Sequence, residues 1–212
     1  MEGETGMLDL TQHNDLVITQ QVEHLEAFVG FETANRYNIM TEDGQHLLYA
    51  FEESGAISRQ FLGSHRPLSI HVVEDGSRHV FTAQRSFFWF MSHLHIRDDS
   101  DKHIGSLQRK MKFLGRRFDL EGPNGQLVAE VRGRLLRPHT FMIHIPGDDE
   151  VARVTKKWSG LIREAFTDAD TFRLQFHNDL DQDFRVLVLA TAFAIDMDFF
   201  ENNNKRGGIG FG

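Results

Sequence analysis

The sequence predicts an all-β-dominated fold, an antiparallel barrel of about twelve strands that encloses one hydrophobic C-terminal α-helix. Two observations lead to this prediction. Between residues 37 and 154 the chain repeats one pattern, in which two runs with apolar residues at alternate positions flank a turn rich in Asp, Asn, Pro or Gly. Near the C-terminus, residues 184–200 are apolar on every helical face. With 212 residues, the chain is long enough for one large all-β domain with its own core.

The first fifteen residues are polar and aperiodic, which predicts a flexible tether at residues 1–15. This stretch lacks the basic start and apolar core that a signal peptide needs. Because the chain has no cysteine, neither a disulfide framework nor a thiolate zinc site can form. We therefore expect a cytoplasmic protein, with the barrel at residues 16–201 and a second flexible segment at residues 202–212.

The strands are predicted from alternating apolar residues and from turn chemistry. Asn, Asp, Gly and Pro between two alternating runs are typical of β-hairpins. Four hairpins are expected, at residues 37–51, 68–83, 117–131 and 141–154. Single runs occur around Leu16, Phe28, Ile57, Leu94, Ile104, Leu161 and Phe172. Such a succession of strands indicates a closed or sandwiched antiparallel sheet without an internal domain boundary.

Residues 183–200 are predicted to form the central helix. Its large apolar members are Phe184, Val186, Leu187, Val188, Leu189, Phe193, Ile195 and Phe199. Only about ten residues of this segment lack charge, whereas a membrane-spanning helix needs ~20. Asp196 and Asp198 would also have to enter hydrocarbon. We therefore favour a helix buried in the barrel over a membrane span, since a barrel of about a dozen strands has room for a helix about 10 Å across.

Composition and motifs argue against several classes of function. The 31 acidic residues outnumber the 23 basic ones, which gives a net charge of −8 and makes nucleic acid an unexpected partner. The sequence contains no Gly-x-Ser-x-Gly elbow, phosphate-cradling glycine loop or His-Glu-x-x-His pair, so we do not expect an enzyme. His93 and His95 would share one strand face near His103, but this set lacks a fourth metal ligand.

Two blocks of sequence resemble the phospholipid scramblase family. The first is Gln20-Gln21-Val22-Glu23-His24-Leu25-Glu26 with the segment Gly30 to Tyr37, and the second runs from Lys156 to Phe172. The segment from Ile195 to Glu201 and the turn from Ser64 to Pro67 add to the resemblance, which extends from about residue 16 to residue 201. It implies a tubby-like fold, a twelve-stranded barrel around a C-terminal helix. It also implies calcium-stimulated, ATP-independent movement of phospholipid between membrane leaflets.

The resemblance further implies a calcium loop over residues 168–179, with Ca²⁺ as the candidate cofactor. Its ligand positions in this chain are Asp168, Asp170, Phe172, Leu174, Phe176 and Asp179. A calcium loop normally has oxygen ligands at most of these positions and glycine at the sixth, where this chain has Arg173. The alternating apolar residues instead favour a half-buried strand. In the alternative interpretation, Asp179, Asp181 and Asp183 cap the helix that follows.

Two groups of residues are candidates for membrane contact. Phe87, Phe88, Trp89 and Phe90 form a non-alternating aromatic run, which would either insert in the membrane interface or form a core strand. Basic residues are concentrated further along the chain, where they would attract anionic lipid or simply cover a solvated strand face. These residues are Lys110, Lys112, Arg116, Arg117, Arg132 and Arg134, with Arg137 beside them.

The leading functional hypothesis is a scramblase-family protein bound peripherally to the inner face of the plasma membrane through anionic phospholipid. A barrel filled by its own helix, however, offers no hydrophilic path across a hydrocarbon core of ~30 Å. The second hypothesis is therefore a tubby-like module that binds a lipid headgroup or a protein partner and has no scrambling activity.

Overall fold

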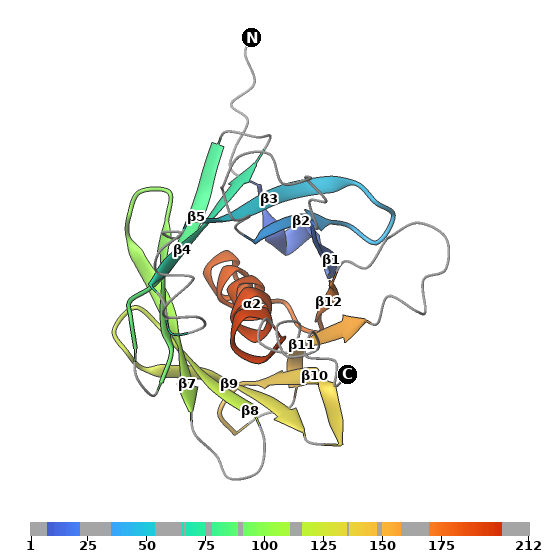
Figure 1. Ribbon diagram of the computed structural model, residues 1–212. Helices are drawn as coiled ribbons and strands as arrows, with labels where there is room; N and C mark the ends of the chain where they lie inside the picture. Colours follow the sequence, from blue (N-terminus) through green and yellow to red (C-terminus); the bar gives the residue numbers. More distant parts are fainter. Residues whose placement is uncertain are drawn as a thin grey trace, which may run out of the picture.

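The computed structural model describes residues 8–21, 35–53, 65, 67–74, 78–88, 91–110, 116–134, 136–147, 150–157 and 170–200. These residues form a single closed antiparallel barrel of twelve strands around one central helix. Figure 1 looks along the barrel and shows the helix α2 inside the ring of strands. The predicted fold class is confirmed.

Each strand pairs with its neighbours in sequence, and β1 pairs with β12 to close the barrel. The strands are β1 (Asp15–Gln20), β2 (Arg36–Met40), β3 (His46–Glu53), β4 (Leu68–Glu74), β5 (Arg78–Arg85), β6 (His93–Asp98), β7 (His103–Lys110), β8 (Arg116–Glu121), β9 (Leu127–Arg134), β10 (Arg137–His144), β11 (Glu150–Lys157) and β12 (Thr171–Phe176). All four predicted hairpins are present. Closure leaves no unpaired sheet edge, so the described backbone of the wall is satisfied without a second sheet.

The alternating direction of side chains along each strand decides which of them face the helix. On β12, Phe172, Leu174 and Phe176 are at most 5% exposed, whereas the residues between them are more accessible. On β1, Leu16 and Ile18 are fully buried. Since successive side chains of a strand point to opposite faces, these apolar positions line the interior of the barrel.

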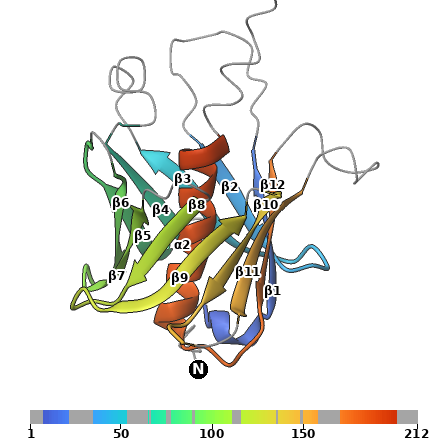
Figure 2. The same cartoon turned by 90° about the horizontal axis from the view of Figure 1, so that it is seen from below.

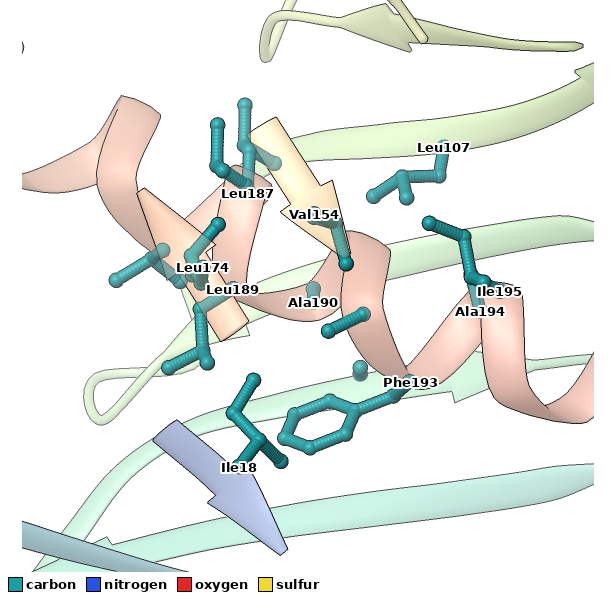
Figure 3. Packing of buried hydrophobic residues seen from close by; sticks show 14 of the residues in the cluster. Ile18, Leu107, Val154, Leu174, Leu187, Leu189, Ala190, Phe193, Ala194 and Ile195 are labelled. Carbon is teal, nitrogen blue, oxygen red and sulfur yellow. The ribbon is translucent and has the colours of Figure 1, made fainter. Parts of the chain in front are cut away.

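The interior is filled by α2 (Gln182–Ile195), which continues as a π-helical turn, η4 (Asp196–Phe200). Asp181 caps the N-terminus, because its carboxylate accepts a hydrogen bond of 2.8 Å from the backbone N–H of Phe184. Every residue from Arg185 to Ile195 is buried. Figure 3 shows helix residues among Ile18, Leu107, Val154 and Leu174 of the wall. The central helix was predicted at residues 183–200, which agrees with the observed helical span of 182–200.

The two ends of the barrel differ in how they meet the helix (Figure 2). The helix begins near a 3-10 turn, η1 (Leu10–Gln12), and ends at Phe200. We call these the Leu10 end and the Phe200 end. At the Leu10 end, the backbone N–H of Leu10 donates to the side chain of Gln182 at 2.8 Å, and Leu10 is fully buried. The predicted tether at residues 1–15 is therefore wrong for residues 8–15, since residues 8–14 lie against the start of the helix, where Leu10 supplies apolar surface, and Asp15 begins β1.

Several predicted features lie outside the described residues. These are the runs around Phe28, Ile57 and Leu161, the hairpin turn at residues 75–76, and the segment 202–212. The described strands agree with the eight predicted hairpin strands and with the runs around Leu16, Leu94, Ile104 and Phe172.

Candidate functional site

The Phe200 end contains buried charges that hold the last helical turn inside the barrel. The hydroxyl of Tyr37 donates to Asp196 at 2.9 Å. Arg85 forms an ion pair of 2.8 Å with Asp198, and both side chains are 1% exposed. Lys156 Nζ lies 3.8 Å from Asp196. Because carboxylates are unfavourable near the negative end of a helix dipole, these donors and cations are needed to stabilise the aspartates there.

Further basic side chains from the wall meet Phe199. The guanidinium carbon of Arg109, on β7, lies 4.9 Å from the Phe199 ring centroid, and that of Arg116, on β8, lies 4.8 Å from it. Arg116 also donates a hydrogen bond of 3.1 Å to the carbonyl of Pro138. Two guanidinium groups from neighbouring strands thus share one aromatic ring, in the geometry of cation–π contacts.

A second pair of basic residues meets Phe200. Lys156 Nζ, on β11, lies 3.9 Å from the ring centroid, and the His139 ring, on β10, stacks on it at 5.6 Å. Lys156 also forms an ion pair of 2.5 Å with Asp170. We call Arg109, Arg116, His139 and Lys156 the inner cation cluster.

The charges of this cluster affect one another. Burial and the nearby charge of Arg109 lower the pKa of Arg116. Burial lowers the pKa of His139 as well, and the charges of Lys156 and Arg116 add to this effect. Basic groups from β7, β8, β10 and β11 are therefore close enough at the Phe200 end for Arg109 to act on Arg116, and for Arg116 and Lys156 to act on His139.

Exposed apolar residues surround the same end. Phe87 is 38% exposed and Met91 is 44% exposed, in the connection that follows Arg85. Leu136, in the turn between β9 and β10, is 96% exposed. Phe88 is half-buried, stacks on His65 at 5.0 Å, and lies under the Arg85 guanidinium at 5.0 Å. The described part of the aromatic run lies outside any strand, so the core-strand interpretation is wrong for it, while Trp89 and Phe90 lie outside the described residues.

The predicted basic patch divides into three groups. On the outer wall, Lys110 lies 3.3 Å from Asp119, Arg117 contacts both Asp119 and Glu130, and Arg132 lies 2.7 Å from Glu130. These charges are therefore largely matched by carboxylates.

The other members of the patch lie elsewhere. Arg116 points inward, as described above. Arg134 and Arg137 are exposed and pair with each other in the sheet register beside Leu136. Lys112 lies outside the described residues.

The candidate calcium positions do not surround a common point. Phe172, Leu174 and Phe176 lie on β12, with side chains in the core and backbone paired to β1 and β11. The prediction of a calcium loop is therefore wrong for the described residues, because the backbone of β12 is hydrogen-bonded within the barrel wall. Asp170 binds Lys156, and Asp168 lies outside the described residues.

The helix-capping alternative agrees with the structure for Asp181, which is the N-cap, and for Asp183, which lies in the first turn. Asp179 lies close enough to Arg185 for its charge to raise the pKa of that residue, although burial lowers it more strongly. The three aspartates thus lie at or near the positive end of the helix dipole, where carboxylates are stabilised.

The three candidate histidines are neighbours on the outer wall. The rings of His93 and His95 are 4.2 Å apart, and those of His95 and His103 are 5.6 Å apart. His93 Nε2 lies 3.0 Å from the hydroxyl of Ser106, which donates to Glu121. Among the described residues, no group of three or more His, Asp or Glu side chains has an arrangement suited to a metal ion.

Sequence reasoning missed Tyr37, Arg85, Arg109 and His139 at the Phe200 end. A signal was available, because Asp196 and Asp198 follow an apolar helix that is buried on all sides. Buried carboxylates require donors or cations, and inward positions at the ends of wall strands were the places to search for them.

The described part of the chain has no helix that combines the length and the apolar character needed to cross a membrane.

Comparison with known proteins identifies relatives over nearly the whole chain. The profile of the family described as Scramblase matches residues 1–202. Phospholipid scramblase 1 of Rattus norvegicus is 30% identical over 220 residues, covering 96% of this chain and 66% of the rat protein. Phospholipid scramblase 1 of Mus musculus is 31% identical, covering 96% of this chain and 67% of the mouse protein. The chain thus spans about two thirds of the length of these relatives.

A more distant relative and a solved structure extend the comparison. A phospholipid scramblase family protein of Schizosaccharomyces pombe is 27% identical, covering 95% of this chain and 63% of that protein. The X-ray structure of a protein from Arabidopsis thaliana matches with a TM-score of 0.51 and 12% identity, covering 90% of this chain and 99% of that one. This last match shows a likeness of fold, and the fold is tubby-like.

Proposed function

This chain belongs to the phospholipid scramblase family, and from that premise we propose that it binds anionic phospholipid at a membrane surface through the Phe200 end of its barrel. The cytoplasmic side of the plasma membrane, which is rich in anionic lipid, is the surface that such an arrangement fits.

One observation carries this proposal. Phe87, Met91 and Leu136 are exposed apolar residues at the same end of the barrel as the exposed Arg134 and Arg137. Aromatic and aliphatic side chains flanked by arginine are typical of surfaces that enter the membrane interface, where the apolar groups leave water and the cations meet lipid phosphates. The outer wall is less suited to this role, since its cations Lys110, Arg117 and Arg132 are matched by Asp119 and Glu130.

We further propose that the membrane-bound protein takes part in movement of phospholipid between leaflets, the activity that the family name implies, and that this movement is calcium-stimulated and ATP-independent, as expected from the resemblance described above. The backbone of β12 is hydrogen-bonded to β1 and β11, so it cannot form the predicted calcium loop. In this proposal, calcium therefore binds where the protein meets anionic lipid.

The second candidate is a module that recognises a lipid headgroup or a protein partner without moving lipid. It is favoured by the enclosed helix. α2 is buried from Arg185 to Ile195, and Tyr37, Arg85 and Lys156 hold the η4 turn that follows it inside the barrel. A barrel filled in this way offers lipid no polar route through its interior.

The test compares binding and exchange on the same vesicles. Purified protein is sedimented with neutral or anionic vesicles, with and without calcium, and leaflet exchange of a labelled lipid is then measured. Binding with calcium-dependent exchange supports the scramblase proposal, whereas binding without exchange supports the headgroup module. Absence of binding to every vesicle would refute both lipid proposals and leave the protein partner.

A matched pair of variants locates the membrane-binding surface. Leu136→Ser changes an exposed leucine at the Phe200 end, and Leu127→Ser changes an exposed leucine at the start of β9, at the other end. We expect the first variant to lower the bound fraction and the second to leave it unchanged. An equal effect of both variants would contradict the proposed orientation.

A further inference from the structure

Within the inner cation cluster, Lys156 is paired with Asp170, but the two arginines have more positive charge than the described carboxylates around them compensate. Among the described residues, no carboxylate lies within ion-pair distance of Arg116, whose guanidinium makes one hydrogen bond, to the carbonyl of Pro138. The carboxylate near Arg109 is that of Asp198, at 3.9 Å, and it is bound more closely by Arg85 at 2.8 Å. A partly buried guanidinium without a counter-charge is unfavourable, so a bound anion would stabilise this end of the barrel.

The cluster is accessible as well as charged. The side chain of Arg109 is 35% exposed, and Arg116 is half-buried. A guanidinium has five N–H donors, of which Arg116 uses one in the contact with Pro138. Donors therefore remain for a ligand that approaches from the Phe200 end.

The aromatic rings hold these donors in place. The guanidinium carbons of Arg109 and Arg116 both lie within 5 Å of the Phe199 ring centroid, and Lys156 Nζ lies 3.9 Å from that of Phe200. Contact with a ring limits the rotation of a long side chain, so less conformational entropy is lost when a ligand binds. The cluster is thus partly organised for binding.

We propose that the inner cation cluster binds a phosphate group through Arg109 and Arg116, with Lys156 adding charge. Guanidinium groups match phosphate well, because each can donate two parallel hydrogen bonds to its oxygens. Several cations that repel one another also favour a small anion with several oxygens over a single carboxylate. The phosphate comes from a lipid headgroup, in which case this inference rests on the function proposed above, or from the free ion.

The site is distinct from the exposed arginines beside Leu136. Those arginines attract any anionic surface through charge alone, an effect that salt screens. The inner cation cluster is partly withdrawn from water, so it should bind one phosphate per chain, saturably and with a weaker dependence on salt.

The test uses the full chain and calorimetric titration with two probes, inorganic phosphate and a short-chain phosphatidic acid below its micelle concentration. Arg116→Gln should weaken binding of both probes by roughly 10- to 100-fold, since it removes a charge-assisted contact. Arg97→Gln, on the outer face of β6, is the matched control and should leave both affinities unchanged. Equal losses in the two variants, or unchanged binding by Arg116→Gln, would overturn the proposal.

Measurements on the unmodified protein test the site even if the Arg116→Gln variant fails to fold. The ring resonances of His139, which senses the charges of Lys156 and Arg116, should shift saturably as either probe is added. A thermal melt should also move upward with phosphate concentration, as expected for a ligand of the folded state. Absence of both changes refutes the site.

The two probes and a vesicle assay separate the sources of phosphate. Tighter binding of the phosphatidic acid supports a lipid headgroup, and equal binding of both probes supports the free ion. If anionic vesicles bind but neither soluble probe does, the proposed function stands and this site fails. If the soluble probes bind but vesicles do not, the site stands and the proposed lipid function fails.

Discussion

Replacement of Gly105 by alanine should disrupt the contact between the barrel wall and the helix. Gly105 lies on β7, and a Cβ atom there would be 2.4 Å from the carbonyl oxygen of Glu121 on β8 and 2.9 Å from a methyl group of Leu187 on α2. Ordinary carbon–oxygen and carbon–carbon contacts are about 3.3 Å and longer. The strand and the helix would therefore have to move apart by several tenths of an ångström, in a core that is closely packed.

The expected loss of stability has two parts. Overpacking of a core costs about 1–3 kcal/mol, and the positive φ of Gly105 adds about 1 kcal/mol for a residue with a side chain. Gly125→Ala is the matched control, because Gly125 also has a positive φ but has nothing within 4 Å of the added Cβ. The Gly125→Ala variant should lose only the stability that depends on the positive φ, about 1 kcal/mol.

The assay is urea unfolding of the two variants and the unmodified chain, followed by circular dichroism. We expect the midpoint to fall substantially further for Gly105→Ala than for Gly125→Ala, at similar slopes. If the two variants lose equal stability, β7 is not packed as closely against β8 and the helix as the structure shows, and the reasoning is refuted.

Three other predictions follow from the core, the exposed aromatic segment and the outer wall. Leu189→Ala removes a fully buried side chain from α2, so the free energy of unfolding should fall by about 2–5 kcal/mol in urea titration; a loss below ~1 kcal/mol would contradict its place in the core. Phe87→Ser should reduce sedimentation with anionic vesicles and leave the melting temperature unchanged, and a fall in melting temperature alone would assign Phe87 a packing role instead. Burial and the neighbouring His93 and His103 lower the pKa of His95 below its ordinary 6.5, so the unfolded chain binds a proton more readily. Stability should therefore fall as the pH drops below 6.5, and His95→Gln should reduce that dependence; an unchanged pH profile would argue against it.

The strands were predictable because they depend on local chemistry. A two-residue period buries one face of each strand, and turns with Asn, Asp or Gly set where the chain reverses. Gly125 and Gly147, each in a predicted turn, adopt the positive φ that glycine permits at low cost. The apolar segment of α2 was equally informative, since its length and the two aspartates that follow it favoured burial over a membrane span.

The candidate site was less predictable, because its residues come together only in three dimensions. Arg116 was counted with the basic outer residues, but the register of β8 turns it inward onto Phe199 while Arg117 points outward to Asp119 and Glu130. Adjacent arginines in a strand always face opposite sides, yet the sequence does not say which of them faces the helix until the strand's pairing is known.

The sequence by itself therefore determined the class of fold, the number and order of most strands, the buried helix and the family, since alternation, turn residues and apolar length are local properties. Only the tertiary structure decided where charge is compensated and where it is not. The closed barrel brings β7, β8, β10 and β11 around the end of the helix, and so places Arg109, Arg116, His139 and Lys156 against two phenylalanines. Electrostatic interactions depend on distance and burial, and neither quantity can be read from separation along the chain.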